Sequence, residues 1–387
     1  MKTIRMLNPI AKIGLDKLPS DYTVSDTEVC PDAILVRSAS MHDMEFPSSL
    51  LAVARAGAGV NNIPVASLTE KGIVVFNTPG ANANGVKELT LASLFLAARD
   101  IYGGIKWTET LAENVAKTVE KGKKQFAGIE LKGKTLGVMG LGAIGGAVAA
   151  SAASEAIGMN VLGYDPYLSP ESASSLPCSV KLVENYEEVF DQADFITLHL
   201  PLADNTRGLL NREAFSRMKD GVRVINLSRA ELVDTDALLD ALNSGKLARY
   251  VTDFPTDETV KVPNLITVPH LGASTEESED NCAILAVTEL IDFLENGNIK
   301  NSVNFPNVNL PRASAVRLCV AHRNIPGMLS KISLAISDYG INIAHMASAS
   351  KGDIAYTLVD LDKEELPVNA KNLIDDMEGV LSLRLIS

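Results

Sequence analysis

The sequence lacks the features that mark membrane, metal-binding and disulfide-stabilised proteins. Its 387 residues include only four cysteines, which are scattered without metal-binding or redox spacing and suit a reducing cytosol. Its apolar runs are too short to span a membrane, and the N-terminal MKTIRMLNPIAKIGLD lacks the continuous apolar stretch of a signal peptide. We therefore expect a cytoplasmic protein with no metal ion and no membrane association.

Positive charge is also scarce. The chain has 35 lysines and arginines against 48 acidic residues, a formal net charge of −13, and its basic residues form no cluster. A nucleic-acid partner is therefore not expected. Apolar residues make up 46% of the chain, which is ample for large cores, and at about 150 residues per domain the length corresponds to two or three domains.

The strongest pattern runs from Thr135 to Asp165. A short apolar strand leads into Gly140, Gly142 and Gly145, which have GxGxxG spacing, and an Ala-rich helix and a second strand follow. The first glycine permits a tight turn, the second lets the backbone approach a pyrophosphate, and the third lets the helix pack against the strand. The acid at the end of the second strand can bind both ribose hydroxyls and repel a 2′-phosphate. The sequence therefore predicts NAD as the cofactor rather than NADP.

Alternating strand and helix patterns surround this stretch and predict an α/β fold. Residues 93–275 are expected to form a doubly wound parallel-sheet Rossmann domain, and residues 1–92 plus 276–304 a flavodoxin-like substrate domain. A single helix is expected from Val86 to about Thr108, as the bridge between the two domains. The expected strands of the first domain are Thr3–Leu7, Ala33–Val36, Leu51–Arg55 and Ile73–Phe76.

The end of the chain has a different pattern. A Pro- and Asn-rich linker, NSVNFPNVNLP, precedes residues 315–387, which are expected to form a small α+β module with βαββαβ order. Its predicted elements are strands Val316–Ala321, Ile341–Ala347, Ile354–Leu361 and Val380–Ile386, and helices Met328–Tyr339 and Asn369–Met377.

Two arginines follow neighbouring candidate strands, Arg37 in RSAS and Arg55 in RAGAG. Ligands of open α/β sheets bind at the carboxyl ends of the strands, so two arginines there indicate an anion site. The alternative is that both are solvated surface charges, which is usual for arginine.

One imidazole, one carboxylate and one guanidinium follow strands of the second domain: His270 in VPHLGAST, Glu258 in DFPTDE and Arg229 in NLSRAELVD. This set suits hydride transfer to and from a hydroxy acid. Arg229 would hold the substrate carboxylate and carbonyl through forked hydrogen bonds. His270 would move the hydroxyl proton, and Glu258 would orient its ring and raise its pKa.

Several motifs resemble a known family. GLGAIG, YDP, HLPL, NLSRAELVD and VPHLGAST are similar to the D-2-hydroxyacid dehydrogenases. RSAS, RAGAGVNNI and VNFPN resemble the D-3-phosphoglycerate dehydrogenases within that family, and HRNIPGMLSKI with YGINIAHM resembles the serine-sensing ACT domain. The resemblance implies NAD-dependent oxidation of D-3-phosphoglycerate to 3-phosphohydroxypyruvate, the first step of L-serine biosynthesis. It also implies L-serine as a possible effector and a homodimer or homotetramer.

The resemblance carries roles over to individual residues. It implies that Arg229, Glu258 and His270 are catalytic. It implies substrate contacts by Arg37, Ser38, Arg55, Ala56 and Gly57, and effector contacts by His322, Asn324 and Asn342. The positions implied around NAD, with the three glycines, are Thr78, Gly140, Gly142, Ala143, Ile144, Gly145, Asp165, Pro201, Leu227, Ser228, Asp253, Gly272 and Ala273.

Some alternatives stay open from the sequence. Only 11 residues separate Glu258 from His270, so Asp257 could be the partner of the histidine. We assign Glu258 because its spacing of 29 from Arg229 fits the family pattern without a gap. Arg323 stands between two effector positions where serine-inhibited relatives can carry an acid. The substrate could also be an unphosphorylated 2-hydroxy acid such as glyoxylate or hydroxypyruvate, and the protein could be an NADH-sensing corepressor.

Overall fold

The computed structural model describes all 387 residues, which form two compact units. Unit 1 comprises Met1–Asn82 with Glu276–Ser387, and unit 2 comprises Ala83–Thr275. The sequence predicted that the first domain boundary follows residue 92, whereas the structure has it ten residues earlier, after Asn82. The reason is the helix α3 (Ala83–Ala98), whose buried Val86 and Leu94 belong to the hydrophobic core of unit 2.

The N-terminal part of unit 1 is a five-stranded sheet with the order β2-β1-β3-β4-β5, and all its strand pairs are parallel. This order is that of flavodoxin-like folds. The two faces of the sheet belong to different cores, one shared with α11 and the other with α2. The bounds are β1 Lys2–Met6, β2 Tyr22–Ser25, β3 Ala33–Val36, β4 Ala52–Arg55, β5 Val74–Phe76, α1 Lys12–Leu15, α2 Val65–Glu70 and α11 Glu276–Asn296.

Unit 2 contains a seven-stranded parallel sheet with the order β12-β11-β10-β9-β6-β7-β8, as predicted for a Rossmann domain. The strand order reverses at β6 and β9, and the carboxyl ends at such a switch point form the usual ligand crevice. The strands are β6 Thr135–Met139, β7 Asn160–Tyr164, β8 Val180–Leu182, β9 Phe195–Leu198, β10 Val222–Asn226, β11 Leu247–Thr252 and β12 Leu265–Thr267. The helices between them are α6 Ala143–Ala153, α7 Pro170–Ser175, α8 Tyr186–Gln192, α9 Arg212–Arg217, the 3₁₀ turn η2 Ala230–Leu232 and α10 Thr235–Asn243.

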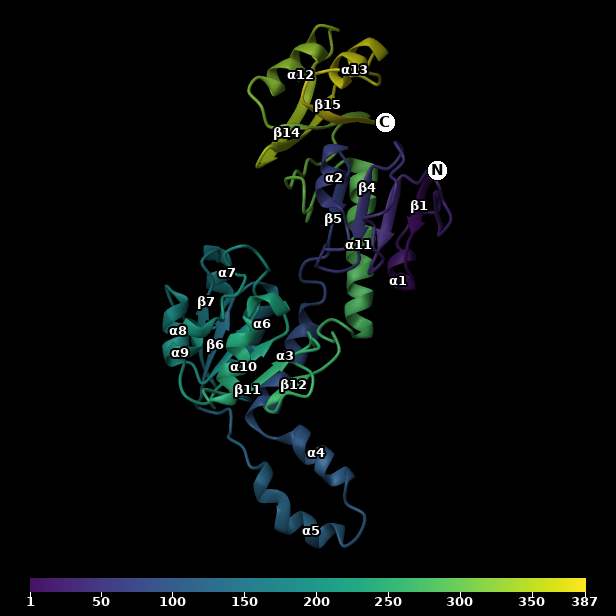
Figure 1. The fold of residues 1–387 in the computed structure, drawn as a ribbon. Helices are drawn as coiled ribbons and strands as arrows, with labels where there is room; N and C mark the ends of the chain where they lie inside the picture. The colour runs from purple at the N-terminus through teal and green to yellow at the C-terminus, as the bar shows by residue number, and fades with distance from the viewer. The chain divides into compact units, whose positions relative to one another are not determined.

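The prediction of one helix over 86–108 is wrong, because α3 ends at Ala98 and α4 begins at Ile101. Asp100 separates them: its carboxylate accepts a hydrogen bond from the N–H of Gly103 at 3.2 Å and caps the new helix. The following segment contains the helix α5 and a 3₁₀ turn, and Figure 1 shows α4 and α5 projecting from the sheet of their unit. The bounds are α4 Ile101–Glu109, α5 Val115–Gly122 and η1 Lys123–Phe126.

The C-terminal module, residues 315–387, has the predicted βαββαβ order, and its antiparallel sheet is ordered β14-β15-β13-β16. The helices α12 and α13 cover one face of this sheet (Figure 1). The other face shares a core with α11, so β15 is buried along its whole length. The bounds are β13 Val316–Arg323, α12 Met328–Ser337, β14 Ile343–Lys351, β15 Ile354–Leu361, α13 Val368–Asp375 and β16 Val380–Ile386.

A fully buried ion pair joins the module to the rest of unit 1. The Arg317 guanidinium donates to both carboxylate oxygens of Asp360, at 2.6 and 2.9 Å. Its other N–H groups donate to the backbone oxygens of Asn296 at 2.8 Å, Leu310 at 2.7 Å and Pro311 at 3.1 Å. The five hydrogen bonds use all the donors of the guanidinium. They tie the end of α11, the linker and the module together.

Asp360→Ala is expected to lower the free energy of unfolding of the protein by about 3–5 kcal/mol, because it leaves a buried guanidinium without its counter-ion. Urea denaturation followed by circular dichroism measures the change. Asp16→Ala is the matched control, since Asp16 forms an ion pair with Lys12 on the surface and its loss should cost less than about 1 kcal/mol. Equal losses in the two variants would contradict the role given to the buried pair.

Candidate functional site

The three glycines of the GxGxxG stretch differ in their surroundings. Gly140 has a φ of 89°, and a Cβ there would lie 2.5 Å from the carbonyl oxygen of His199. A Cβ on Gly145 would lie 1.8 Å from the carbonyl oxygen of Gly140. A Cβ on Gly142 would meet no protein atom within 4 Å. The first and third glycines are therefore needed by the fold, and the second leaves open space beside the backbone.

The helix α6 begins at this open position. Gly142 is its N-cap and offers no side-chain cap, and the carbonyl oxygen of Gly142 accepts from the N–H of Gly146 at 2.8 Å. The N–H groups of the first helical turn, starting at Ala143 and Ile144, have no partner within the helix. Together with the helix dipole they suit a phosphate group.

Asp165 follows β7 beside the glycine loop. One carboxylate oxygen accepts from the N–H of Leu141 and the other from the N–H of Tyr167, each at 2.9 Å. These bonds fix the carboxylate at the switch point. Each oxygen keeps a lone pair for a ribose hydroxyl, so the residue fits the NAD role predicted for it.

Gly142→Ala is expected to leave the stability of the protein within about 0.5 kcal/mol of the original but to weaken NAD binding about tenfold, because the new methyl group occupies the space open to the phosphates. Gly145→Ala should instead lower the free energy of unfolding by about 1–3 kcal/mol through overpacking. Thermal unfolding and NAD titration by fluorescence measure the two effects. A destabilised Gly142→Ala with normal NAD affinity would contradict this division of roles.

A buried asparagine shapes the loop that carries Arg229. The Asn226 side chain donates to the carbonyl oxygen of Arg229 at 2.8 Å and accepts from the N–H of Ser228 at 3.1 Å. The Ser228 hydroxyl donates to the carbonyl oxygen of Leu198 at 2.6 Å, on the neighbouring strand. The backbone that presents Arg229 is therefore fixed. Asn226 was not predicted as a functional position from the sequence.

Asp253 lies near both His270 and Arg229. Its Oδ2 accepts from the N–H of Gly272 at 3.0 Å, while its Oδ1 is buried without a partner. Burial raises the pKa of the Asp253 carboxyl, although the Gly272 N–H and the charges of His270 and Arg229 oppose the shift. A buried acceptor without a partner is costly. It fits a donor group on a ligand, such as the carboxamide of a nicotinamide ring.

The two candidate partners of His270 are both on the surface. The His270 ring is exposed and packs on Phe254, with 4.8 Å between ring centroids. Glu258 and Asp257 are exposed, and the imidazole donates no hydrogen bond to either carboxylate in the structure. An apolar contact therefore orients the histidine ring here, and both carboxylates remain candidates.

In unit 1, one asparagine organises the loop after β3. The Asn8 side-chain oxygen accepts from three successive N–H groups, those of Arg37, Ser38 and Ala39, at 3.1, 3.0 and 2.9 Å. Asn8 was not predicted as a functional residue from the sequence, although it directly follows the first predicted strand, Thr3–Leu7. Its position there was the signal that could have identified it.

The loop after β4 is joined to the same place. The Arg55 Nε donates to the carbonyl oxygen of Arg37 at 3.0 Å. Gly57 has a φ of 153°, and a Cβ there would lie 2.5 Å from the Arg55 guanidinium. The N–H of Thr78 donates to the carbonyl oxygen of Gly57 at 3.2 Å. Unit 1 thus brings the predicted substrate residues and Thr78 together, while the other predicted NAD contacts lie in unit 2.

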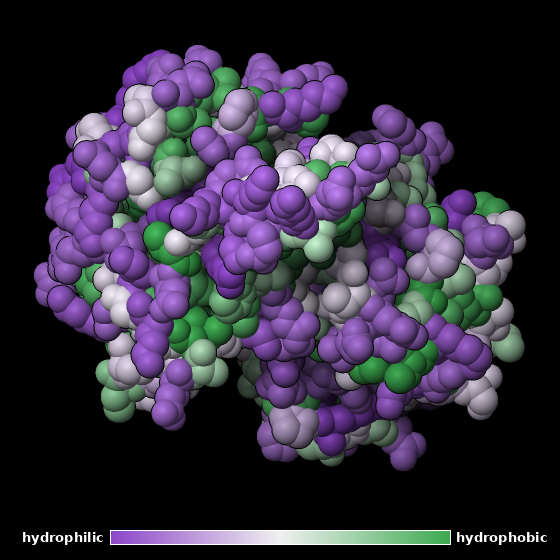
Figure 2. Space-filling view, turned by 90° about the horizontal axis from the view of Figure 1, so that it is seen from below, coloured by the Kyte–Doolittle hydropathy of each residue, from purple (hydrophilic) through white to green (hydrophobic).

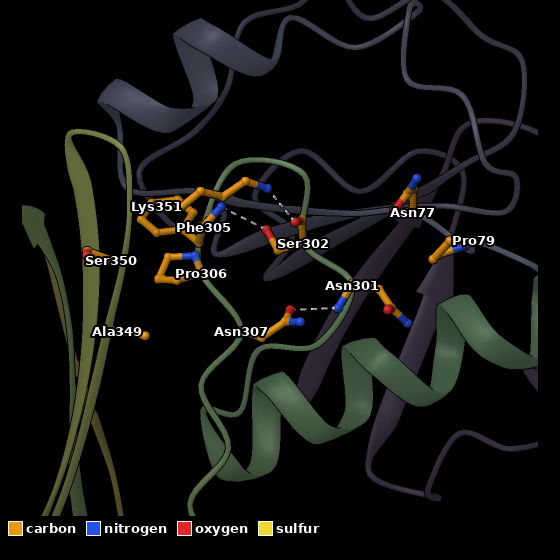
Figure 3. Close-up of a pocket in the computed structure, with 10 residues that line it drawn as sticks. All are labelled: Asn77, Pro79, Asn301, Ser302, Phe305, Pro306, Asn307, Ala349, Ser350 and Lys351. Atoms are coloured by element: carbon orange, nitrogen blue, oxygen red, sulfur yellow. Dashed lines mark hydrogen bonds between the residues drawn. The ribbon is translucent and has the colours of Figure 1, made fainter. Parts of the chain in front are cut away.

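Unit 1 also has a polar pocket of about 510 Å³ (Figure 3), which contains none of the predicted site residues. The Lys351 ammonium donates across it to the carbonyl oxygens of Ser302 at 3.3 Å and Val303 at 3.0 Å. Its lining comes from the loop after β5, the linker and the end of β14: Asn77, Pro79, Asn301, Ser302, Phe305, Pro306, Asn307, Ala349, Ser350 and Lys351.

A smaller pocket of about 330 Å³ lies in the C-terminal module, and His322 and Asn324 line it. The His322 ring nitrogens already bond to the carbonyl oxygen of Arg323 at 2.8 Å and the hydroxyl of Thr357 at 2.9 Å, and burial lowers the pKa of His322. The Arg323 guanidinium pairs with Glu70 on α2. The third predicted effector residue, Asn342, does not line this pocket.

No helix of the structure has the length and hydropathy needed to cross a membrane. The face in Figure 2 is mainly hydrophilic, with scattered hydrophobic patches.

Comparison with known proteins gives the family. Residues 91–272 match the family described as D-isomer specific 2-hydroxyacid dehydrogenase, NAD binding domain. The D-3-phosphoglycerate dehydrogenase of Methanocaldococcus jannaschii is 36% identical over 341 residues, which cover 86% of this chain and 62% of that protein. D-3-phosphoglycerate dehydrogenase 2 of Saccharomyces cerevisiae is 32% identical over 373 residues, 89% of this chain and 75% of that protein.

The structure of an NAD⁺-bound 3-phosphoglycerate dehydrogenase from Entamoeba histolytica is also similar, with a TM-score of 0.60 and 28% identity, covering 78% of this chain and 98% of that one. Unit 2 thus contains the NAD-binding domain of the D-2-hydroxyacid dehydrogenases. The chain belongs to the D-3-phosphoglycerate dehydrogenase family of these enzymes. It spans about half to two thirds of the length of the first curated relatives it matches.

Proposed function

We propose that the protein oxidises D-3-phosphoglycerate to 3-phosphohydroxypyruvate with NAD, in the first step of L-serine biosynthesis. The observation that carries the choice of a phosphorylated substrate is the pairing of Arg37 and Arg55. Their strands end side by side, and the Arg55 side chain bonds to the backbone of Arg37. Two guanidinium groups at adjacent strand ends suit a phosphate dianion.

The chemistry follows from the residues near Asp253. NAD supplies the acceptor for the hydride that leaves the substrate carbon. Arg229 holds the substrate carboxylate and the developing carbonyl oxygen through its forked N–H groups. His270 takes the hydroxyl proton in oxidation and returns it in reduction. Glu258, or Asp257 beside it, stabilises the protonated imidazole when it closes on the ring. Unit 2 and the N-terminal sheet with α11 would serve as the NAD and substrate domains.

The test is NADH formation on adding D-3-phosphoglycerate and NAD. His270→Ala should lower kcat at least about a hundredfold, because it removes the group that moves the proton, while NAD binding stays close to that of the unmodified protein. Glu258→Ala and Asp257→Ala, assayed side by side, identify the partner by the larger loss.

D-glycerate, glyoxylate and hydroxypyruvate serve as comparison substrates in the same assay. Faster turnover of these unphosphorylated acids would replace the proposed substrate. NADH binding without turnover of any 2-hydroxy acid would favour a sensing protein instead.

We also propose that the C-terminal module binds an amino acid such as L-serine and pairs through β14 with a second copy of the chain. The support is the small polar pocket at His322 and Asn324, and the position of β14 at the edge of its sheet.

The four cysteines, all free thiols, support a cytosolic location.

L-serine at millimolar concentration should inhibit the protein, and Asn324→Ala should relieve the inhibition at least about tenfold, because it removes an amide group of the pocket that can bind a zwitterion. Substitutions are preferable to truncation, since the module shares a core with α11. Sedimentation velocity reports the oligomeric state. Activity that stays unchanged at still higher serine concentrations would leave the module a purely structural role.

A further inference from the structure

The predicted phosphate-binding Arg37 forms an ion pair with a carboxylate that the proposed reaction does not use. Its Nη2 lies 2.5 Å from Oε1 of Glu279, in the first turn of α11. The two residues are 242 positions apart in the sequence. Their side chains are 41% and 42% exposed, so a ligand from solvent can reach them.

The neighbouring groups place this pair beside Arg55, the other arginine of the proposed phosphate site. Cys282, one turn along α11, is buried next to the Thr78 hydroxyl. Burial raises the pKa of the Cys282 thiol, the positive charges of Arg55 and Arg37 oppose that shift, and the negative charge of Glu279 adds to it. Both arginines and Glu279 therefore act on the same buried thiol. The site holds two positive charges and one negative charge.

We infer that Glu279 is a specificity-determining residue that competes with the phosphate of the substrate for Arg37. The inference rests on the proposed function, in which Arg37 and Arg55 bind that phosphate. A phosphate dianion needs both guanidinium groups, but the Glu279 carboxylate lies 2.5 Å from that of Arg37. When the phosphate binds, Glu279 must give up its bond to Arg37. Its negative charge then repels the negatively charged ligand. Binding of the phosphorylated acid is thereby weakened, whereas an acid without phosphate is affected much less.

A purely structural role explains the contact less well. A half-exposed ion pair contributes little to stability. The helix α11 is already anchored by buried residues of its apolar face, among them Ala283, Ala286 and Leu290. The charge of Glu279 is therefore more important for the ligand than for the helix.

The test compares Glu279→Gln with Glu279→Asp. The glutamine keeps the shape and a hydrogen-bond acceptor but removes the charge, and the aspartate keeps the charge. Glu279→Gln should lower the KM for D-3-phosphoglycerate about three- to fivefold, with little change in kcat or in the KM for D-glycerate. Glu279→Asp should stay close to the unmodified protein. The gain should shrink at 0.5 M salt, because screening weakens the repulsion.

Glu277→Gln is the matched control, since Glu277 is exposed in the same helical turn and has no bond to Arg37. The same decrease in KM in both variants would show only a general charge effect and would overturn the inference. A higher KM for D-3-phosphoglycerate in Glu279→Gln would also overturn it, because Glu279 would then position Arg37 for the substrate.

Calorimetric titration of D-3-phosphoglycerate separates this inference from the proposed function. A protein inactive towards every 2-hydroxy acid would refute the proposed function. Even if the protein is inactive, its Glu279→Gln variant should bind D-3-phosphoglycerate more tightly than its Glu277→Gln variant. That result would support the competition at Arg37, and equal binding would refute it.

Discussion

The Arg317–Asp360 ion pair is the interaction on which the arrangement of unit 1 depends. The guanidinium bonds to the end of α11, to the linker and to the central strands of the C-terminal module. Burial by itself would raise the pKa of Asp360, but the hydrogen bonds from Arg317 and from the N–H of Ala313 outweigh it and lower that pKa. The stabilisation is therefore complete at neutral pH and is lost as pH falls through the lowered pKa.

The helix held by this pair, α11, connects the C-terminal module with the loop after β3. Its C-terminal end meets Arg317, its middle covers the N-terminal sheet, and its first turn carries Glu279 beside Arg37. Any movement of the module that shifted α11 along the sheet would change the charge around Arg37. The same helix therefore joins the module to the loop after β3, with the Arg317–Asp360 ion pair at one end and the Glu279 carboxylate beside Arg37 at the other.

The strand patterns and the glycine spacing were enough to predict the parallel sheets, the NAD-binding domain and the order of elements in the C-terminal module. Long apolar runs and GxGxxG depend on local chemistry, which the sequence displays directly. The exposed edge strand β2 and the polar α5 have no such pattern and were not predicted. The break between α3 and α4 depends on one capping carboxylate, Asp100, inside a stretch that is otherwise helical in composition.

Contacts between distant segments were beyond the reach of the sequence. The Asn8 side chain binds the backbone of a loop 29 residues further along the chain, which leaves no periodic signal. Asp253 was assigned to the cofactor by resemblance, but its unpartnered oxygen could be recognised only in three dimensions. The pairing of Glu279 with Arg37 likewise joins residues that are separated by the whole of unit 2.

The discontinuous unit 1 has a consequence for biosynthesis. The sheet residues Leu35, Ala54 and Phe76 share their core with α11, and the Phe76 ring packs on Phe293 with 5.6 Å between centroids. On the ribosome that helix emerges only after the whole of unit 2 has been made. Unit 2, a continuous segment, can fold first, while the N-terminal strands wait with one apolar face uncovered. The nascent chain therefore passes through a stage at which an apolar face of residues 1–82 is exposed while the continuous nucleotide-binding domain can already be folded.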